Sequence, residues 1–162
     1  MSSRLVVRQG EFEMASSIMS EAAEWLAGKG QPLWPLDEVS VQRLRERCKS
    51  DEILVGYIGA EPVVAALLQW SDPFFWPGKT DSGFIHKLAI RRAFAGQGHP
   101  AALLLWAANA CRAASRRFLR LDCVASREKL CAFYEQQGFR RVGLLVREPY
   151  FRAALYELEL NS

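Results

Sequence analysis

The sequence predicts a mixed α/β (α+β) domain of 162 residues, with a mostly antiparallel central sheet, one parallel central strand pair and flanking helices. A strand on each side of a long apolar helix, from 100 to about 115, predicts the parallel pair, because such strands need a crossover connection. Short connections between strands near both ends predict antiparallel neighbours. Half of the residues are hydrophobic, which is enough for an ordinary core.

Apolar periodicity and turn residues define the elements of the first half. Apolar side chains recur every three or four residues after Glu11, and Gly28 ends that run, which predicts a helix. Asp37 is a suitable N-cap for a second helix. The expected elements are a strand at 5–8, helices at 11–27 and 37–48, and strands at 53–58 and 62–70.

The second half reads in the same way. Gly138 suits the C-terminal end of a short helix, because glycine adopts the left-handed conformation there. The expected elements are a strand at 83–90, the helix at 100–115, a strand at 118–124, a helix at 128–137, and strands at 139–146 and 151–160. No linker-like stretch interrupts this order, so we expect one domain over 1–162.

Composition disfavours several classes of protein. The four cysteines form no C-x-x-C pair, and with two histidines there is no zinc-ligand spacing, so no metal site is predicted. No apolar stretch is long enough for a bilayer and no secretory signal is visible, so we expect a cytoplasmic protein without membrane contact. The net charge of +3 is mild and no aromatic-interleaved basic stripe occurs, which disfavours nucleic-acid binding.

The turn before the long helix is the most informative segment. Exposed N–H groups at a helix start can bind an anion, and glycines let the chain approach a pyrophosphate closely. The alternative is that the glycines only make a tight turn. The turn and helix start comprise Ala95, Gly96, Gln97, Gly98, His99, Pro100 and Ala101.

This turn resembles the acetyl-CoA-binding motif of the GNAT superfamily of N-acetyltransferases, Gln/Arg-x-x-Gly-x-Gly/Ala, with Gly98 at the central glycine. The segment 133–139 is similar to the Tyr-Glu-x-x-Gly-Phe motif of the same superfamily. Three residues depart from the family pattern: Ala95, Pro100 and Arg127. Pro100 lacks an N–H for a phosphate, which weakens cofactor binding or shifts it to neighbouring groups.

The resemblance implies an acetyl-CoA-dependent transferase that moves an acetyl group directly to a primary amine of a small molecule or peptide. Superfamily members often form homodimers. Two alternatives are an acyl-CoA-binding domain with a sensing role and little turnover, and an unrelated α/β domain with a structural glycine turn. The cofactor contacts that the resemblance implies are Leu88, Ala89, Ile90, Ala95, Gly96, Gln97, Gly98, His99, Pro100, Ala101, Arg127 and Tyr134.

Two residues are candidates for proton transfer. Tyr134 matches the family tyrosine that protonates the leaving sulfur; the alternative is a tyrosine packed in the core. His86 is the candidate base, because an imidazole can accept a proton from an ammonium near neutral pH. The alternatives are that His86 has a structural role and that a chain of water molecules removes the proton. Glu128 and Asp122 are further candidates for the base.

The acceptor site is expected among aromatic and acidic residues of loops and strand ends. Aromatic faces and carboxylates attract a cationic amine. The resemblance implies that the segments of the aromatic residues line the acceptor pocket, with packing in the core as the alternative for each of them. The predicted contacts are Trp34, Trp70, Asp72 and Trp76. The pattern does not identify the amine.

Overall fold

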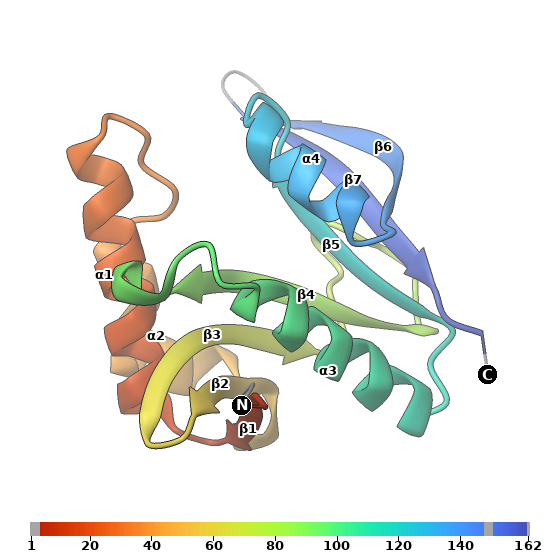
Figure 1. Ribbon diagram of the computed structural model, residues 1–162. Helices are drawn as coiled ribbons and strands as arrows, with labels where there is room; N and C mark the ends of the chain where they lie inside the picture. Colours follow the sequence, from red (N-terminus) through yellow and green to blue (C-terminus); the bar gives the residue numbers. More distant parts are fainter. Residues whose placement is uncertain (1–3, 148–150, 162) are drawn as a thin grey trace. The chain divides into compact units, whose positions relative to one another are not determined.

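The computed structural model describes residues 4–147 and 151–161 and contains a seven-stranded sheet (Figure 1). The strands are β1 (Val6–Gln9), β2 (Ile53–Ile58), β3 (Glu61–Gln69), β4 (Ser82–Ile90), β5 (Phe118–Val124), β6 (Arg140–Arg147) and β7 (Phe151–Glu159). The α-helices are α1 (Phe12–Gly28), α2 (Val41–Arg47), α3 (His99–Ala113) and α4 (Glu128–Gln136). Short 3-10 helices cover Leu36–Val39, Ser50–Glu52 and Arg92–Phe94.

The sheet order is β1-β2-β3-β4-β5-β7-β6, and β4 and β5 are parallel. The β1–β2, β2–β3, β5–β7 and β6–β7 pairs are antiparallel. The predicted fold class is therefore confirmed, including the parallel pair formed by the strands that precede and follow the long helix along the chain. No helix in the described part of the chain is both long and apolar enough to cross a bilayer.

The residues group into two units by their internal contacts, the first comprising Met1–Leu68 and Lys87–Trp106 and the second Gln69–His86 and Ala107–Ser162. In the first unit, α1 buries one apolar face. Its residues Phe12, Ala15, Ile18, Met19 and Ala22 pack with Ile53, Val55, Tyr57, Ala65, Leu67 and Ala89 of the strands. The expectation of one domain over 1–162 stays a prediction.

One predicted helix start was wrong. Asp37 lies in the 3-10 helix Leu36–Val39 and does not cap α2. Ser40 is the N-cap, because its hydroxyl accepts a hydrogen bond from the N–H of Arg43 at 3.2 Å. Serine and aspartate are both good N-caps, so propensity alone does not decide between two candidates three residues apart.

In the second unit a buried arginine holds three segments together. Arg120 of β5 pairs with Glu157 of β7 at 2.9 Å and with Asp81 at 2.8 Å, and it donates to the hydroxyl of Ser82. Its side chain is only 5% exposed. A guanidinium is suited to such a position because its five donors can serve several acceptors at once.

Buried thiols are expected to make the free energy of unfolding decrease at alkaline pH. Cys111 of α3 is fully buried, and burial raises the pKa of its thiol from 9.0 to about 11. An unfolded thiol ionises first, so this contribution to stability is present below about pH 9 and is lost as the pH rises to about 11. The wild type should lose unfolding free energy between about pH 8 and about pH 11. We expect this loss to be smaller in Cys111→Ala by on the order of 2 kcal/mol.

Urea denaturation at the two pH values would test this expectation. Cys48 has a similarly raised pKa of about 11, so the variant should keep part of the alkaline loss. An equal loss in the wild type and in Cys111→Ala would contradict the assignment to this thiol.

Candidate active site

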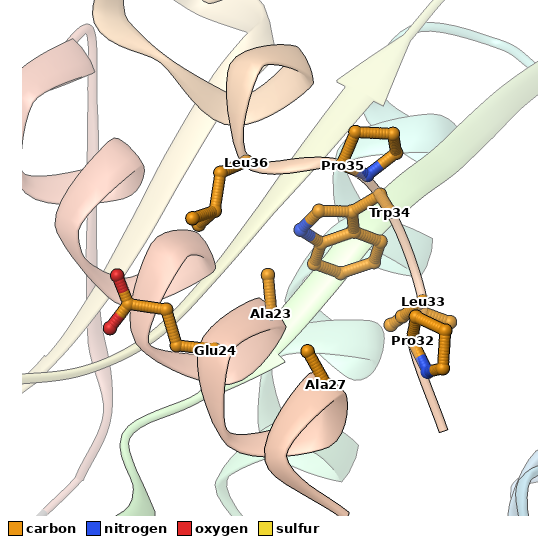
Figure 2. A pocket seen from close by; sticks show the side chains of 8 residues that line it. All are labelled: Ala23, Glu24, Ala27, Pro32, Leu33, Trp34, Pro35 and Leu36. Carbon is orange, nitrogen blue, oxygen red and sulfur yellow. The ribbon is translucent and has the colours of Figure 1, made fainter. Parts of the chain in front are cut away.

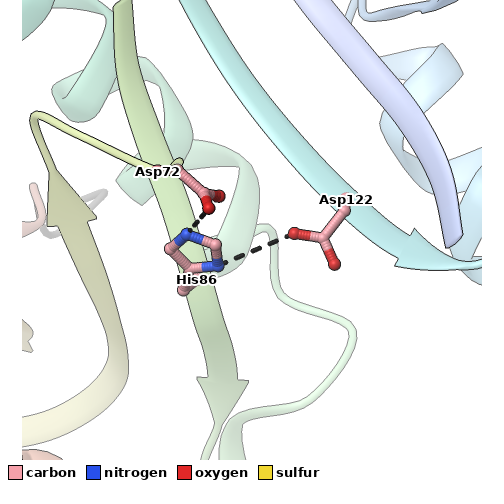
Figure 3. A group of neighbouring side chains, drawn as sticks. All are labelled: Asp72, His86 and Asp122. Carbon is pink, nitrogen blue, oxygen red and sulfur yellow. Dashed lines mark ion pairs between the residues drawn. The ribbon is translucent and has the colours of Figure 1, made fainter. Parts of the chain in front are cut away.

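The imidazole of His86 lies between two carboxylates in the second unit. Its Nε2 is 3.0 Å from Oδ2 of Asp72, and its Nδ1 is 3.7 Å from Oδ1 of Asp122 (Figure 3). A neutral imidazole has one N–H and one lone pair. Nε2 is thus the ring nitrogen nearer to a carboxylate oxygen, and Nδ1 is the more distant one.

The fold around the cluster explains why these residues meet. The parallel register of β4 and β5 pairs Ile85 with Leu121, and His86 and Asp122 are the next residues of the two strands. Asp72 belongs to the turn after β3, where its Oδ1 accepts from the N–H of Phe75 at 3.1 Å. The N–H of Trp76 donates to the carbonyl of Asp72 at 2.9 Å. A turn with these two bonds holds the carboxylate at a fixed orientation toward the ring.

Tyr134 lies on α4 and is buried. Its ring packs edge-on to those of Phe133 and Phe139, with centroids 5.3 and 5.9 Å away. Burial raises the pKa of its phenol well above the usual value, and the charges of Cys123, Asp122 and Cys131 add to the effect. The phenol is therefore protonated throughout the neutral range, and its burial makes it a weaker acid than a free tyrosine.

The glycine turn lies in the first unit. Gly96 and Gly98 have positive φ angles of 77° and 83°, and a Cβ added at either position would meet no atom within 4 Å. The helix α3 follows directly, with its first bond from the N–H of Ala102 to the carbonyl of Gly98 at 3.1 Å. The N–H groups of a first turn have no acceptor within the helix. His99 and Ala101 therefore offer donors to a ligand, while Pro100 has none.

Polar contacts with α1 fix the approach to this turn. Glu21 of α1 accepts from the backbone N–H of Arg92 at 2.8 Å and pairs with the guanidinium of Arg91 at 3.3 Å. The guanidinium of Arg92 stacks on the ring of Trp25 at 3.5 Å from its centroid. Arg91 and Arg92, which precede the turn, thus contact side chains of α1. The predicted anion contacts therefore depend mainly on backbone groups.

The strand β4 changes its backbone conformation just before Leu88, Ala89 and Ile90. Lys87 has a φ of 56°, which is rare for a residue with a side chain. The regular side-chain alternation of the strand predicted at 83–90 is therefore interrupted at Lys87. Residues held in such conformations are concentrated at functional sites, because the surrounding structure must offset the strain.

An apolar pocket of about 430 Å³ lies between α1 and the loop after it (Figure 2). Trp34 forms part of its wall, and the indole N–H has no hydrogen-bond partner among the described residues although solvent does not reach it. Glu24 is the one charged residue of the lining. The lining comprises Ala23, Glu24, Ala27, Pro32, Leu33, Trp34, Pro35 and Leu36.

The other predicted contacts lie in different surroundings. Trp70 is half-buried, with the guanidinium of Arg116 at 5.3 Å from its ring centroid. Trp76 is buried beside Arg120, and Arg127 is the residue that precedes the first turn of α4. Their roles in binding stay predictions.

Two residues with different predicted roles, Asp72 and His86, lie in contact in the structure. Asp72 was expected to attract the acceptor amine, and its carboxylate lies against His86, the expected base. Asp122 is an alternative base, and its Oδ1 lies 3.7 Å from Nδ1, the other nitrogen of the same ring. No short motif connects these residues. The signal that could have related His86 to Asp122 is the parallel pairing of their strands.

Comparison with known proteins agrees with the expected resemblance. Residues 15–139 match the model of the acetyltransferase (GNAT) family. The chain is 28% identical over 142 residues to an uncharacterized N-acetyltransferase, YesJ, of Bacillus subtilis (strain 168). That alignment covers 82% of this chain and 78% of YesJ.

Solved structures show the same fold. An acetyltransferase of the GNAT family from Listeria monocytogenes 4b F2365 aligns with a TM-score of 0.76 at 20% identity and covers 99% of both chains. The ribosomal-protein-S18-alanine N-acetyltransferase of Escherichia coli aligns with a TM-score of 0.70 at 15% identity, over 98% of this chain and 95% of that one. At such identities the likeness concerns the fold.

Proposed function

Because the chain belongs to the acetyltransferase (GNAT) family, we propose that it transfers an acetyl group from acetyl-CoA directly to a primary amine. The observation that carries the proposal is the orientation of His86 by Asp72, with Nε2 and Oδ2 3.0 Å apart. An oriented imidazole with one lone pair left is what removal of a proton from an ammonium requires.

The turn and the strand before it would hold the CoA thioester. No atom lies within 4 Å of a Cβ added at Gly96 or Gly98, which supports a close approach of a pyrophosphate to the backbone, and the N–H groups at the start of α3 would be donors with the helix dipole behind them. Backbone groups of Leu88 and Ile90 would pair with the pantetheine arm. Acetyl-CoA, when bound, would supply an activated thioester carbonyl as the acetyl donor.

Two side chains carry out the proton transfers of this reaction, His86 as the base and Tyr134 as the acid. Nδ1 of His86 takes a proton from the acceptor ammonium, so the amine nitrogen can attack the thioester carbon. The carbon–sulfur bond breaks, and Tyr134 gives its phenolic proton to the departing thiolate. The new amide nitrogen then releases its extra proton, which restores the phenol of Tyr134 directly or through solvent. Asp72 acts through His86, because a carboxylate 3.0 Å from Nε2 would favour the tautomer with the N–H on Nε2 and the lone pair on Nδ1, so it is a positioning residue.

The pocket beside Trp34 favours an acceptor with an apolar part. Its lining is apolar except for Glu24, whose carboxylate would attract a cationic group. Aromatic and aliphatic primary amines are therefore the first compounds to assay.

Isothermal titration calorimetry with acetyl-CoA, followed by an amine screen, would test the proposal. We expect binding by the wild type and a loss of at least about 100-fold in affinity for Gly98→Asp, because the carboxylate would repel the phosphates and a side chain at φ 83° is strained. Gly59→Asp is the matched control, since Gly59 also has a positive φ and open space around a Cβ but lies between β2 and β3.

The outcomes separate clearly. Binding by the wild type and Gly59→Asp, but not by Gly98→Asp, would support the cofactor site. Equal affinities for all three proteins would refute it. Binding without transfer to any amine would instead indicate an acyl-CoA-binding domain with a sensing role.

A further inference from the structure

Three side chains with metal-ligating atoms converge at the ring of His86. Asp72, His86 and Asp122 each offer one such atom, and the three atoms lie within 4.8 Å of one another (Figure 3). They come from the turn after β3, from β4 and from β5. Because 14 and 36 residues separate them along the chain, no spacing motif could have predicted the cluster.

The carboxylate of Asp72 is the second observation that indicates a cation. Its side chain is 7% exposed, and solvent does not reach its Oδ2. That oxygen has no hydrogen-bond partner among the described residues and meets Nε2 of His86 in an ion pair. A buried carboxylate oxygen without a hydrogen bond is costly. A cation bound between Oδ2 and the ring would remove that cost.

The charge of the cluster also favours a cation. Two carboxylates and one imidazole are negative overall even when the imidazole is protonated. Arg120 lies two residues before Asp122 on β5, so it is on the same face, but its guanidinium is paired with Asp81 and Glu157. A divalent ion would neutralise the excess charge without any rearrangement of this arginine.

The donor set identifies the class of ion. One nitrogen and two carboxylate oxygens suit zinc and similar divalent metals, whereas Mg²⁺ and Ca²⁺ prefer oxygen ligands. Zinc bonds of about 2.0–2.2 Å in tetrahedral geometry place ligand atoms roughly 3.3 Å apart. The 3.0 Å between Nε2 and Oδ2 of Asp72 is close to this value, and Asp122 has to move inward. His86 and Asp122 are 19% and 15% exposed, which leaves an entry path.

We propose that Asp72, His86 and Asp122 form a binding site for a zinc-class divalent cation, and that its occupation blocks acetyl transfer. The second part rests on the proposed function. An ion bound at Nε2 displaces the N–H proton to Nδ1, so Nδ1, the nitrogen that would accept a proton from the amine, no longer has a lone pair. A ring that turns to coordinate the ion also loses the orientation set by Asp72. Zinc is thus an inhibitor that competes for the catalytic base.

Calorimetric titration of the full chain with Zn²⁺, without acetyl-CoA or amine, would test the binding site. We expect one ion per chain in the wild type, no binding by His86→Ala and at least about tenfold weaker binding by Asp72→Asn. Mg²⁺ should give no signal. Circular dichroism would show that the variants are folded.

Two control variants exclude other ligands. His99→Ala removes the other histidine, and the double variant Cys123→Ser/Cys131→Ser removes two thiols that lie 3.6 Å apart. Both should bind Zn²⁺ as the wild type does, and bound Co²⁺ should show no sulfur-to-cobalt charge transfer. Absence of Zn²⁺ binding, retained binding in His86→Ala, or loss of binding in the cysteine variant would overturn the proposal.

An activity assay separates this proposal from the proposed function. A metal-free enzyme that Zn²⁺ inhibits and a chelator restores would support both. An active enzyme whose rate is unchanged at saturating Zn²⁺ would overturn the inhibition. An inactive metal-free protein that still binds Zn²⁺ through His86 would refute the transferase and leave the binding site established.

Discussion

Replacement of His86 by alanine is expected to lower kcat for acetyl transfer by about 10²–10⁴-fold, the usual contribution of a general base. The KM for acetyl-CoA should change little, because the proposed cofactor contacts are made by the glycine turn and by backbone groups. Steady-state kinetics of the metal-free enzyme with a primary amine would measure both constants.

Two further measurements make this test specific to the base. Added imidazole should restore part of the activity of His86→Ala, which a structural role of the ring would not produce. Asp72→Asn should lower kcat less than His86→Ala does, because it changes only the orientation of the ring. A kcat of His86→Ala within about threefold of the wild type would show that a water chain is the base.

Arg120→Ala is expected to destabilise the protein by about 3–5 kcal/mol, because it leaves the partly buried carboxylate of Glu157 without its main partner. The side chains of Arg120 and Glu157 are 5% and 13% exposed, so water replaces the lost bonds poorly. For a domain of this size the melting temperature should fall by roughly 6–20 °C. Thermal denaturation followed by circular dichroism would measure the change.

Arg117→Ala is the matched control on the same strand region. Arg117 pairs with Glu159 at 3.0 Å, but the two side chains are 67% and 55% exposed. Exposed pairs contribute between zero and about 1 kcal/mol. Similar melting temperatures for the two variants would show that the buried network of Arg120 contributes no more than a surface pair.

Periodicity and glycine placement predicted the elements well because they are local properties. The apolar spacing of α1, the turn at Gly96 and Gly98 and the strand–helix–strand order around α3 all lie within short segments. Errors arose where two local signals compete, as at Asp37 and Ser40. The conformation of Lys87 has no local signal, because lysine has no preference for a positive φ.

The individual site residues were also accessible from the sequence, but their relations were not. His86, Asp72 and Asp122 each stood out as polar groups near strand ends or turns. Their distances depend on the register of β4 and β5 and on the hydrogen bonds of the turn after β3. The same holds for the burial of Tyr134 and the raised pKa of its phenol, which depends on neighbours from β5.

The sequence by itself therefore determined the order of the elements, the parallel pair and the glycine turn at the start of α3, because these follow from local periodicity and backbone preference. Only the tertiary structure decided that Asp72 faces His86 and that Arg120 is buried among carboxylates. Contacts between segments far apart in the chain depend on strand register and packing. A change of one residue in register would turn His86 away from Asp122, and no local pattern records that choice.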